Sequence, residues 1–184
     1  NKNIQVQQII NLIFSCAGLT NPINYCSAQS SSEIGICAPT FGLKKEHTTW
    51  NSEFEIIHDQ YQRLNSNAYQ VLIGNNSLLS QKGPKGDIRN FTLKEHKPSG
   101  IFSLPFKSEL TGIKSLSHIE FDYSTNNKSI FIGDFTYYSK SFQVEEIIEL
   151  IENQKQLASF TSFITPENII EQDNNWAPSI YLNE

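Results

Sequence analysis

Apolar residues recur at helical spacing near both ends of the chain and at strand-like spacing in its middle. Stripes with helical spacing predict three helices, over residues 3–18, 50–65 and 141–154. A short last helix is expected after Thr165, which can cap it, because Pro166 suits the first helical position. Helices are therefore expected to flank a central part of different structure.

The central part of the chain has the pattern of β-strands. The expected strands lie at about residues 88–95, 100–106, 116–123 and 129–138. Residues 68–74 are compatible with a strand or with a continuation of the preceding helix. Residues 78–90 are expected to form a surface loop, because Gly83-Pro84 and Gly86 interrupt them.

This order of elements, with helices first, an antiparallel sheet next and helices last, predicts a single α+β domain. A chain of 184 residues is long enough for one such domain to bury a sizeable core. We expect a helical N-terminal part (1–66), a sheet-rich part (67–140), and C-terminal helices with an acidic tail (141–184).

Charge and composition argue against two classes of protein. The formal net charge is −5, and no basic cluster is longer than Lys44-Lys45, so no nucleic-acid groove is expected. No apolar run reaches the roughly 20 residues that span a bilayer, so no membrane span is expected. Methionine is absent even from position 1, which favours a processed or trimmed product.

Residues 117–135 read as a β-hairpin with an ionisable residue at each end and a turn at 125–128. If His118 and Asp134 face each other, their Cβ atoms lie about 5 Å apart on one face. A register shifted by one residue would instead pair His118 with Phe135. A carboxylate beside an imidazole fixes its tautomer and stabilises its cation, which suits a catalytic base. A solvated pair at the rim of the sheet is the alternative.

The other histidines and the cysteines suggest no metal site. His58 lies on the polar side of the second predicted helix, and His47 and His96 stand among charged residues, so all three are expected at the surface. Cysteines occur at positions 16, 26 and 37 only, and this spacing matches no zinc signature.

Asp134 follows His118 by sixteen residues, and an aromatic segment and a helix rich in Glu and Ile come next, in the stretch "IFIGDFTYYSKSFQVEEIIELI". This arrangement resembles the C-terminal half of papain-like cysteine enzymes, especially the YopT-type bacterial effector peptidases and related deamidases. Phe135 stands where that family usually has Pro or Asn, and Ser117 stands where it has Gly. The resemblance implies a papain-like fold, in which N-terminal helices pack on a central antiparallel sheet followed by C-terminal helices.

The resemblance also implies a cysteine nucleophile at a helix N-terminus, where the thiol pKa falls. Cys37, in "GICAPTFGL", is preferred over Cys26, in "NYCSAQ", while Cys16 is placed at the wrong end of a helix. Gln29 is the nearby amide that would complete an oxyanion hole for Cys37. A structural thiol or a disulfide bridge stays open for each cysteine.

These residues predict a cysteine-dependent hydrolase, either a protease or a glutamine deamidase, that acts on a partner protein. The thiolate of Cys37 would attack the carbonyl carbon, His118 would move the proton, and Asp134 would orient His118. No cofactor, metal or nucleic acid is implied, and the oligomeric state is open. The protein would be a secreted effector or toxin, including one delivered into a host or target cell. The alternative is a secreted non-enzymatic binding or assembly domain, such as a minor-pilin-like subunit, with structural cysteines.

Overall fold

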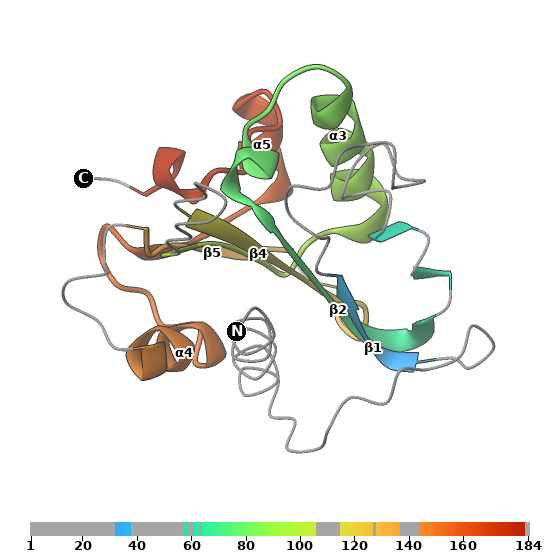
Figure 1. The fold of residues 1–184 in the computed structure, drawn as a ribbon, viewed down its shortest axis with the longest axis horizontal. Coiled ribbons are helices and arrows are strands. Elements are labelled where there is room, and N and C mark those ends of the chain that lie inside the picture. Colours follow the sequence, from blue (N-terminus) through green and yellow to red (C-terminus); the bar gives the residue numbers. More distant parts are fainter. Residues whose placement is uncertain are drawn as a thin grey trace, which may run out of the picture.

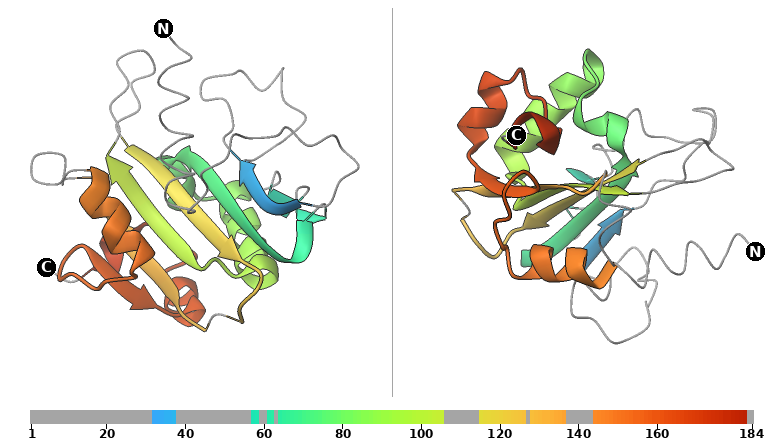
Figure 2. Two further views of the ribbon diagram at one scale, coloured as in Figure 1. Left: turned by 90° about the horizontal axis from the view of Figure 1, so that it is seen from below. Right: turned by 90° about the vertical axis from the view of Figure 1, so that its left-hand side faces the viewer.

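A mixed β-sheet forms the centre of the molecule (Figures 1 and 2). The computed structural model describes residues 32–37, 57–58, 61–62, 64–105, 115–126, 128–136 and 144–182. The strands in these residues are β1 (Ser32–Cys37), β2 (Leu64–Asn75), β3 (Gly100–Pro105), β4 (Ser115–Asp122), β5 (Ile130–Asp134) and β6 (Thr161–Ile164). Their order across the sheet is β1-β2-β4-β3-β5-β6.

Parallel and antiparallel pairs both occur in this sheet. β1 runs parallel to β2, and β3 runs parallel to β5. The pairs β2–β4, β3–β4 and β5–β6 are antiparallel. The expected antiparallel sheet is therefore wrong. Parallel neighbours are joined by crossover connections rather than by tight turns, so they are not visible as local strand–turn–strand patterns.

β4 and β5 do not form the predicted hairpin, because β3 lies between them. Phe102 of β3 is aligned with His118 on one side and with Gly133 on the other. Residues Gly100 to Ser103 of β3 are buried, which suits a strand in the interior of the sheet. The chain between β4 and β5 consequently passes β3 instead of reversing beside β4.

Helix α3 (Pro84–His96) occupies residues that we expected to form a surface loop (78–90) and a strand (88–95). Gly83 precedes it with a φ of 76°, and Pro84 stands at its start. Proline fits the first helical position because its missing N–H would have no partner there. The Gly-Pro pair therefore marks the beginning of a helix and not a loop.

The two C-terminal helices are confirmed as α4 (Val144–Glu152) and α5 (Pro166–Glu171). The side chain of Thr165 accepts a hydrogen bond from the backbone N–H of Asn168, and the side chain of Asn168 accepts one from the backbone N–H of Thr165. This reciprocal cap satisfies two backbone donors that the helix itself leaves unpaired.

The N-terminal predictions are tested only in part. The helix predicted over residues 3–18 lies outside the described residues. Of the helix predicted over 50–65, the structure describes residues 57–58, which are helical, and 61–62, and β2 begins already at residue 64. Residues 68–74 are therefore a strand.

Helices cover both faces of the sheet, with α3 and α5 on one face and α4 on the other (Figure 1). Two 3-10 turns, η2 (Asn76–Leu79) and η4 (Pro178–Ile180), lie on the same side as α3 and α5. None of the helices in the described part of the chain is long and apolar enough to cross a membrane.

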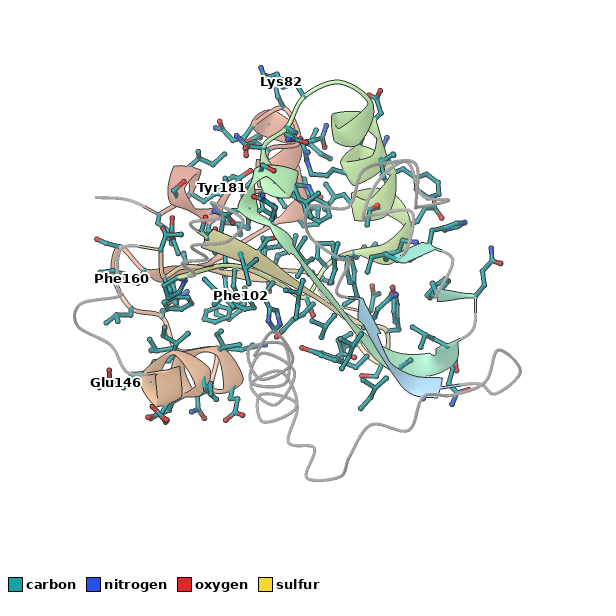
Figure 3. All side chains as sticks on the ribbon, viewed as in Figure 1. Lys82, Phe102, Glu146, Phe160 and Tyr181 are labelled. Atoms are coloured by element: carbon teal, nitrogen blue, oxygen red, sulfur yellow. The ribbon has the colours of Figure 1, made fainter. Side chains whose placement is uncertain are left out.

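Apolar side chains form a cluster on each side of the sheet. The larger cluster, which includes Leu72, Leu93 and Trp176, packs between the sheet and the α3–α5 layer. The smaller cluster includes Phe102 and Ile147 and lies between the sheet and α4, where Figure 3 shows Phe102. Each large side chain that is fully buried stabilises the fold by about 1.5–3 kcal/mol.

Arg89 joins three segments of the α3–α5 layer through a buried guanidinium group. It is 1% exposed and donates hydrogen bonds to the carbonyl oxygens of Leu78 (2.8 Å), Gln81 (2.6 Å) and Asn174 (3.0 Å). Burial lowers the pKa of Arg89. The three carbonyls offset part of the cost of that burial, because a buried charge needs hydrogen-bond partners. Arg89 therefore links η2, the loop before α3 and the loop after α5.

We expect the substitution Arg89→Met to lower the free energy of unfolding by about 3 kcal/mol, because buried carbonyls would lose their donor. Urea denaturation measures this change. Lys94→Met, at an exposed position of the same helix, is the control and should change stability by less than about 0.5 kcal/mol. Equal effects of the two substitutions would contradict a linking role for Arg89.

Candidate functional site

Four strands point their carboxyl ends to the same edge of the sheet. β1 is parallel to β2, β3 is parallel to β5, and β4 runs antiparallel to both β2 and β3. Cys37, Asn75, Pro105 and Asp134 are the last residues of these four strands. In open α/β sheets, ligands bind in the crevice outside the carboxyl ends of the strands. We call this edge the carboxyl edge.

Polar side chains form a row across the sheet beside the carboxyl edge. Ser117 of β4 is aligned with Gly74 of β2 and with Ser103 of β3, and Ser103 is aligned with Asp134 of β5. Aligned residues of neighbouring strands share a face. Ser103 and Ser117 are buried, and the Ser103 hydroxyl donates to Oδ1 of Asn76 at 2.9 Å. The row therefore gathers buried hydroxyl groups with the half-buried amide of Asn76 and the half-buried carboxylate of Asp134, beside the carboxyl edge.

Asp134 closes this row at β5 and stabilises the turn that follows it. One carboxylate oxygen, Oδ1, accepts hydrogen bonds from the backbone N–H of Thr136 (3.0 Å) and from the Thr136 hydroxyl. This is a local turn contact of the kind that Asp favours. The side chain is half-buried, so it can still contact a ligand at the edge.

His118 lies on the opposite face, where its partner is Glu120. Nε2 of His118 is 2.8 Å from Oε1 of Glu120, and the two side chains are 5% and 15% exposed. Successive residues of a strand point to opposite faces, so residues two positions apart lie together. The rings of Phe102 and His118 form a T-shaped pair, with centroids 5.7 Å apart.

Opposing effects act on the Glu120 carboxyl group. Burial raises its pKa, but the hydrogen bond and charge of His118 and a hydrogen bond from Tyr69 outweigh this, and the net pKa lies below its ordinary value. Asp122 acts weakly in the opposite direction. Glu120 is therefore ionised at neutral pH.

The structure does not bring His118 and Asp134 together. They stand two strands apart, which is about 9.6 Å, and their side chains lie on opposite faces of the sheet. The intended carboxylate partner is replaced by Glu120, which the sequence places two residues after His118. The alternation of a strand is the signal that would have identified it.

The structure does not test the predicted nucleophiles or the predicted oxyanion donor. Cys37 is the last residue of β1 and is aligned with Leu72 of β2, and its side chain is outside the description. Cys26 and Gln29 lie outside the described residues, as does Cys16. Their catalytic roles therefore stay predictions.

A second polar group lies at the C-terminal end of α3. His96, expected at the surface, is 5% exposed and packs against the ring of Tyr61, with centroids 4.8 Å apart. Its Nε2 is 3.4 Å from Nδ1 of His58, which is exposed. Burial, and then the proximity of His58, lower the pKa of His96 to about 4. Among the described residues, no group of three or more His, Cys, Asp or Glu side chains is arranged to hold a metal ion.

Comparisons with known proteins identify the fold. No protein-family model matches this chain, and no curated protein matches it. A methyltransferase subunit of the type I restriction–modification system from Streptococcus thermophilus matches with a TM-score of 0.61 over 71% of this chain, at 17% identity. A modification subunit of a type I restriction enzyme from Vibrio vulnificus YJ016 matches with 0.58 over 78%, at 13% identity. A structure of type I restriction–modification complex assembly matches with 0.58 over 81%, at 11% identity.

The chain spans only about a third of the length of these proteins, namely 30%, 36% and 37% of their chains. At these identities the similarity establishes the fold. The sheet and its covering helices therefore have the methyltransferase-like fold of restriction–modification subunits.

This finding corrects the expected family. The papain-like fold is wrong, and with it the cysteine hydrolase, protease and deamidase functions, because the matched proteins are methyltransferase subunits and not cysteine peptidases. The expected exclusion of nucleic acid and the expected protein substrate are contradicted as well, since those subunits belong to restriction–modification systems. The matched proteins are enzymes. This agrees with the expectation that the protein is an enzyme, but it does not support the expected hydrolase activity. Secretion stays a prediction.

We expect Glu120→Gln to lower the free energy of unfolding by about 2 kcal/mol at neutral pH, because His118 loses a charged partner. The depressed pKa of Glu120 stabilises the fold above its unfolded value of about 4.5, and this stability is lost as the pH falls through the folded pKa. The difference in the free energy of unfolding between the wild type and Glu120→Gln should therefore shrink below about pH 4.5.

Urea denaturation at a series of pH values measures this difference. Glu152→Gln, at an exposed position near the end of α4, is the matched control and should show no such convergence. A constant difference between wild type and Glu120→Gln from neutral to acidic pH would contradict an ionised Glu120.

Proposed function

We propose that this chain is part of a DNA-modifying protein with the methyltransferase fold, and that the carboxyl edge of its sheet faces the nucleic acid. The observation that carries the proposal is the match to modification and methyltransferase subunits over 71–81% of this chain. The chemistry would be transfer of a methyl group to a base, with the donor as a second substrate.

The position of the polar row supports the choice of the carboxyl edge. Asn76 places a half-buried amide group where α/β sheets bind their ligands, and the buried Ser103 hydroxyl orients it by donating to its oxygen. Enzymes that modify a base take it out of the stack and hold its edge with hydrogen bonds. Hydroxyl and amide groups can make such bonds, because each both donates and accepts.

The charge of the chain limits the strength with which it can bind DNA. A net charge of −5 without a basic cluster provides few contacts to phosphate groups. Binding by this chain alone should therefore be weak and depend little on salt. The rest of a longer protein would supply the phosphate contacts, in agreement with the 30–37% of the matched chains that this chain spans.

Fluorescence anisotropy with a labelled DNA duplex tests the proposal. We expect saturable binding at about 50 mM salt, with an affinity that falls less than tenfold at about 200 mM, because few counterions are released. Asn76→Asp keeps the acceptor for Ser103 but adds a negative charge at the carboxyl edge. It should weaken binding by about tenfold, which corresponds to about 1.4 kcal/mol.

Asn168→Asp adds the same charge on α5 and serves as the control. Asn168 stands at the third position of that helix, where Asp is well tolerated. We expect its affinity for DNA to stay within twofold of the wild type. Absence of saturable binding at low salt, or equal weakening by both substitutions, would contradict the proposal.

A further inference from the structure

A relay of hydrogen-bonding groups runs from the core to the surface at the C-terminal end of α3. Nε2 of Gln70 donates to the carbonyl of Ile57 at 3.2 Å, and Oε1 of Gln70 accepts from the hydroxyl of Tyr123 at 2.8 Å. The Tyr123 oxygen lies 3.4 Å from Nδ1 of His96, and Nε2 of His96 lies 3.4 Å from Nδ1 of His58. The relay therefore ends at two imidazoles.

This relay determines which nitrogen of His96 carries the proton. Because Gln70 donates to a carbonyl through its nitrogen, its oxygen must face Tyr123. The Tyr123 hydroxyl gives its proton to that oxygen, so its own oxygen is left to accept the proton on Nδ1 of His96. Nε2 of His96 is then an unprotonated nitrogen that points toward His58. An imidazole held this way by a partner on its other nitrogen is ready to bind a metal.

The distance between the two histidine nitrogens fits one coordination geometry. Two nitrogens that bind one tetrahedral Zn²⁺ at about 2.0–2.1 Å lie about 3.3–3.4 Å apart. Neighbouring ligands of a square-planar ion at about 2.0 Å would lie only about 2.8 Å apart. The observed separation of the two nitrogens is 3.4 Å, which agrees with the tetrahedral value.

We propose that His58 and His96 bind Zn²⁺ through Nδ1 and Nε2, respectively. His96 is buried and fixed by Tyr123, whereas His58 is exposed, so the ion can enter from solvent. In the described part of the chain, no further His, Cys, Asp or Glu side chain completes a larger group with them. The ion links residues 57–58, just before β2, to the end of α3.

A titration of the full chain with Zn²⁺, followed by NMR of the imidazole nitrogens, tests this proposal. We expect the nitrogens of His58 and His96 to shift together with added Zn²⁺, while those of His118, which is bonded to Glu120, do not. This readout reports on imidazoles alone, so Zn²⁺ bound by any of the three cysteines does not imitate it. Shifts that exclude His58 and His96 would overturn the proposal.

Two substitutions and a control separate a metal site from a chance contact. His58→Gln changes an exposed side chain and should weaken Zn²⁺ binding at the site at least tenfold. Tyr123→Phe keeps the aromatic ring but releases Nδ1 of His96, and should weaken it about tenfold through the orienting partner. Glu95→Gln, an exposed neighbour of His96, should leave the affinity unchanged. Unchanged affinity in His58→Gln, a variant expected to fold normally, would also overturn the proposal.

Discussion

Strand β3 pairs along both of its edges, with β4 on one side and β5 on the other, and the remainder of the sheet depends on that double pairing. Its residues from Gly100 to Ser103 are buried, so an edge position would leave apolar surface and backbone groups in water. With β3 inserted, β5 becomes parallel to it, and four strands end at one edge of the sheet. The same insertion separates His118 from Asp134 and aligns Ser117 with Ser103.

Local elements could be predicted from the sequence wherever one short segment contains the signal that determines its structure. The helical stripe of α4, the Thr165 cap of α5 and the apolar runs of β3, β4 and β5 all mark their own positions. Helix α3 could not be found in this way, because its residues lack a clear apolar stripe and its Gly83-Pro84 start has the composition of a turn. Its helical state follows from tertiary contacts such as those of Arg89, which involve segments far apart in sequence.

Strand order and the candidate site could not be predicted, because both depend on pairing between distant segments. The sixteen residues from His118 to Asp134 suit a hairpin, and they suit equally a connection that passes a third strand. Only the connection that passes a third strand buries β3 at the centre of the sheet. The sequence of those sixteen residues does not indicate which of the two topologies forms. The polar row could not be predicted for the same reason, because Ser103, Ser117 and Asp134 become neighbours only when distant strands pair. A spacing shared with another family is therefore weak support for a shared site.

Buried polar side chains differ in what their partners imply. The partners of Arg89 are backbone carbonyls of three separate segments, which its hydrogen bonds hold together. The burial of Arg89 is therefore explained by its contribution to the stability of the fold. Glu120 and His118 are each other's hydrogen-bond partners within one strand, which explains their burial without a ligand. His96 is different, because its hydrogen bonding through Tyr123 and Gln70 leaves one nitrogen without a proton beside a second imidazole. A fold that needed only a filled position there would be served by an apolar ring, which would avoid the cost of burying an imidazole. The arrangement of groups around His96 therefore agrees with the proposed Zn²⁺ site.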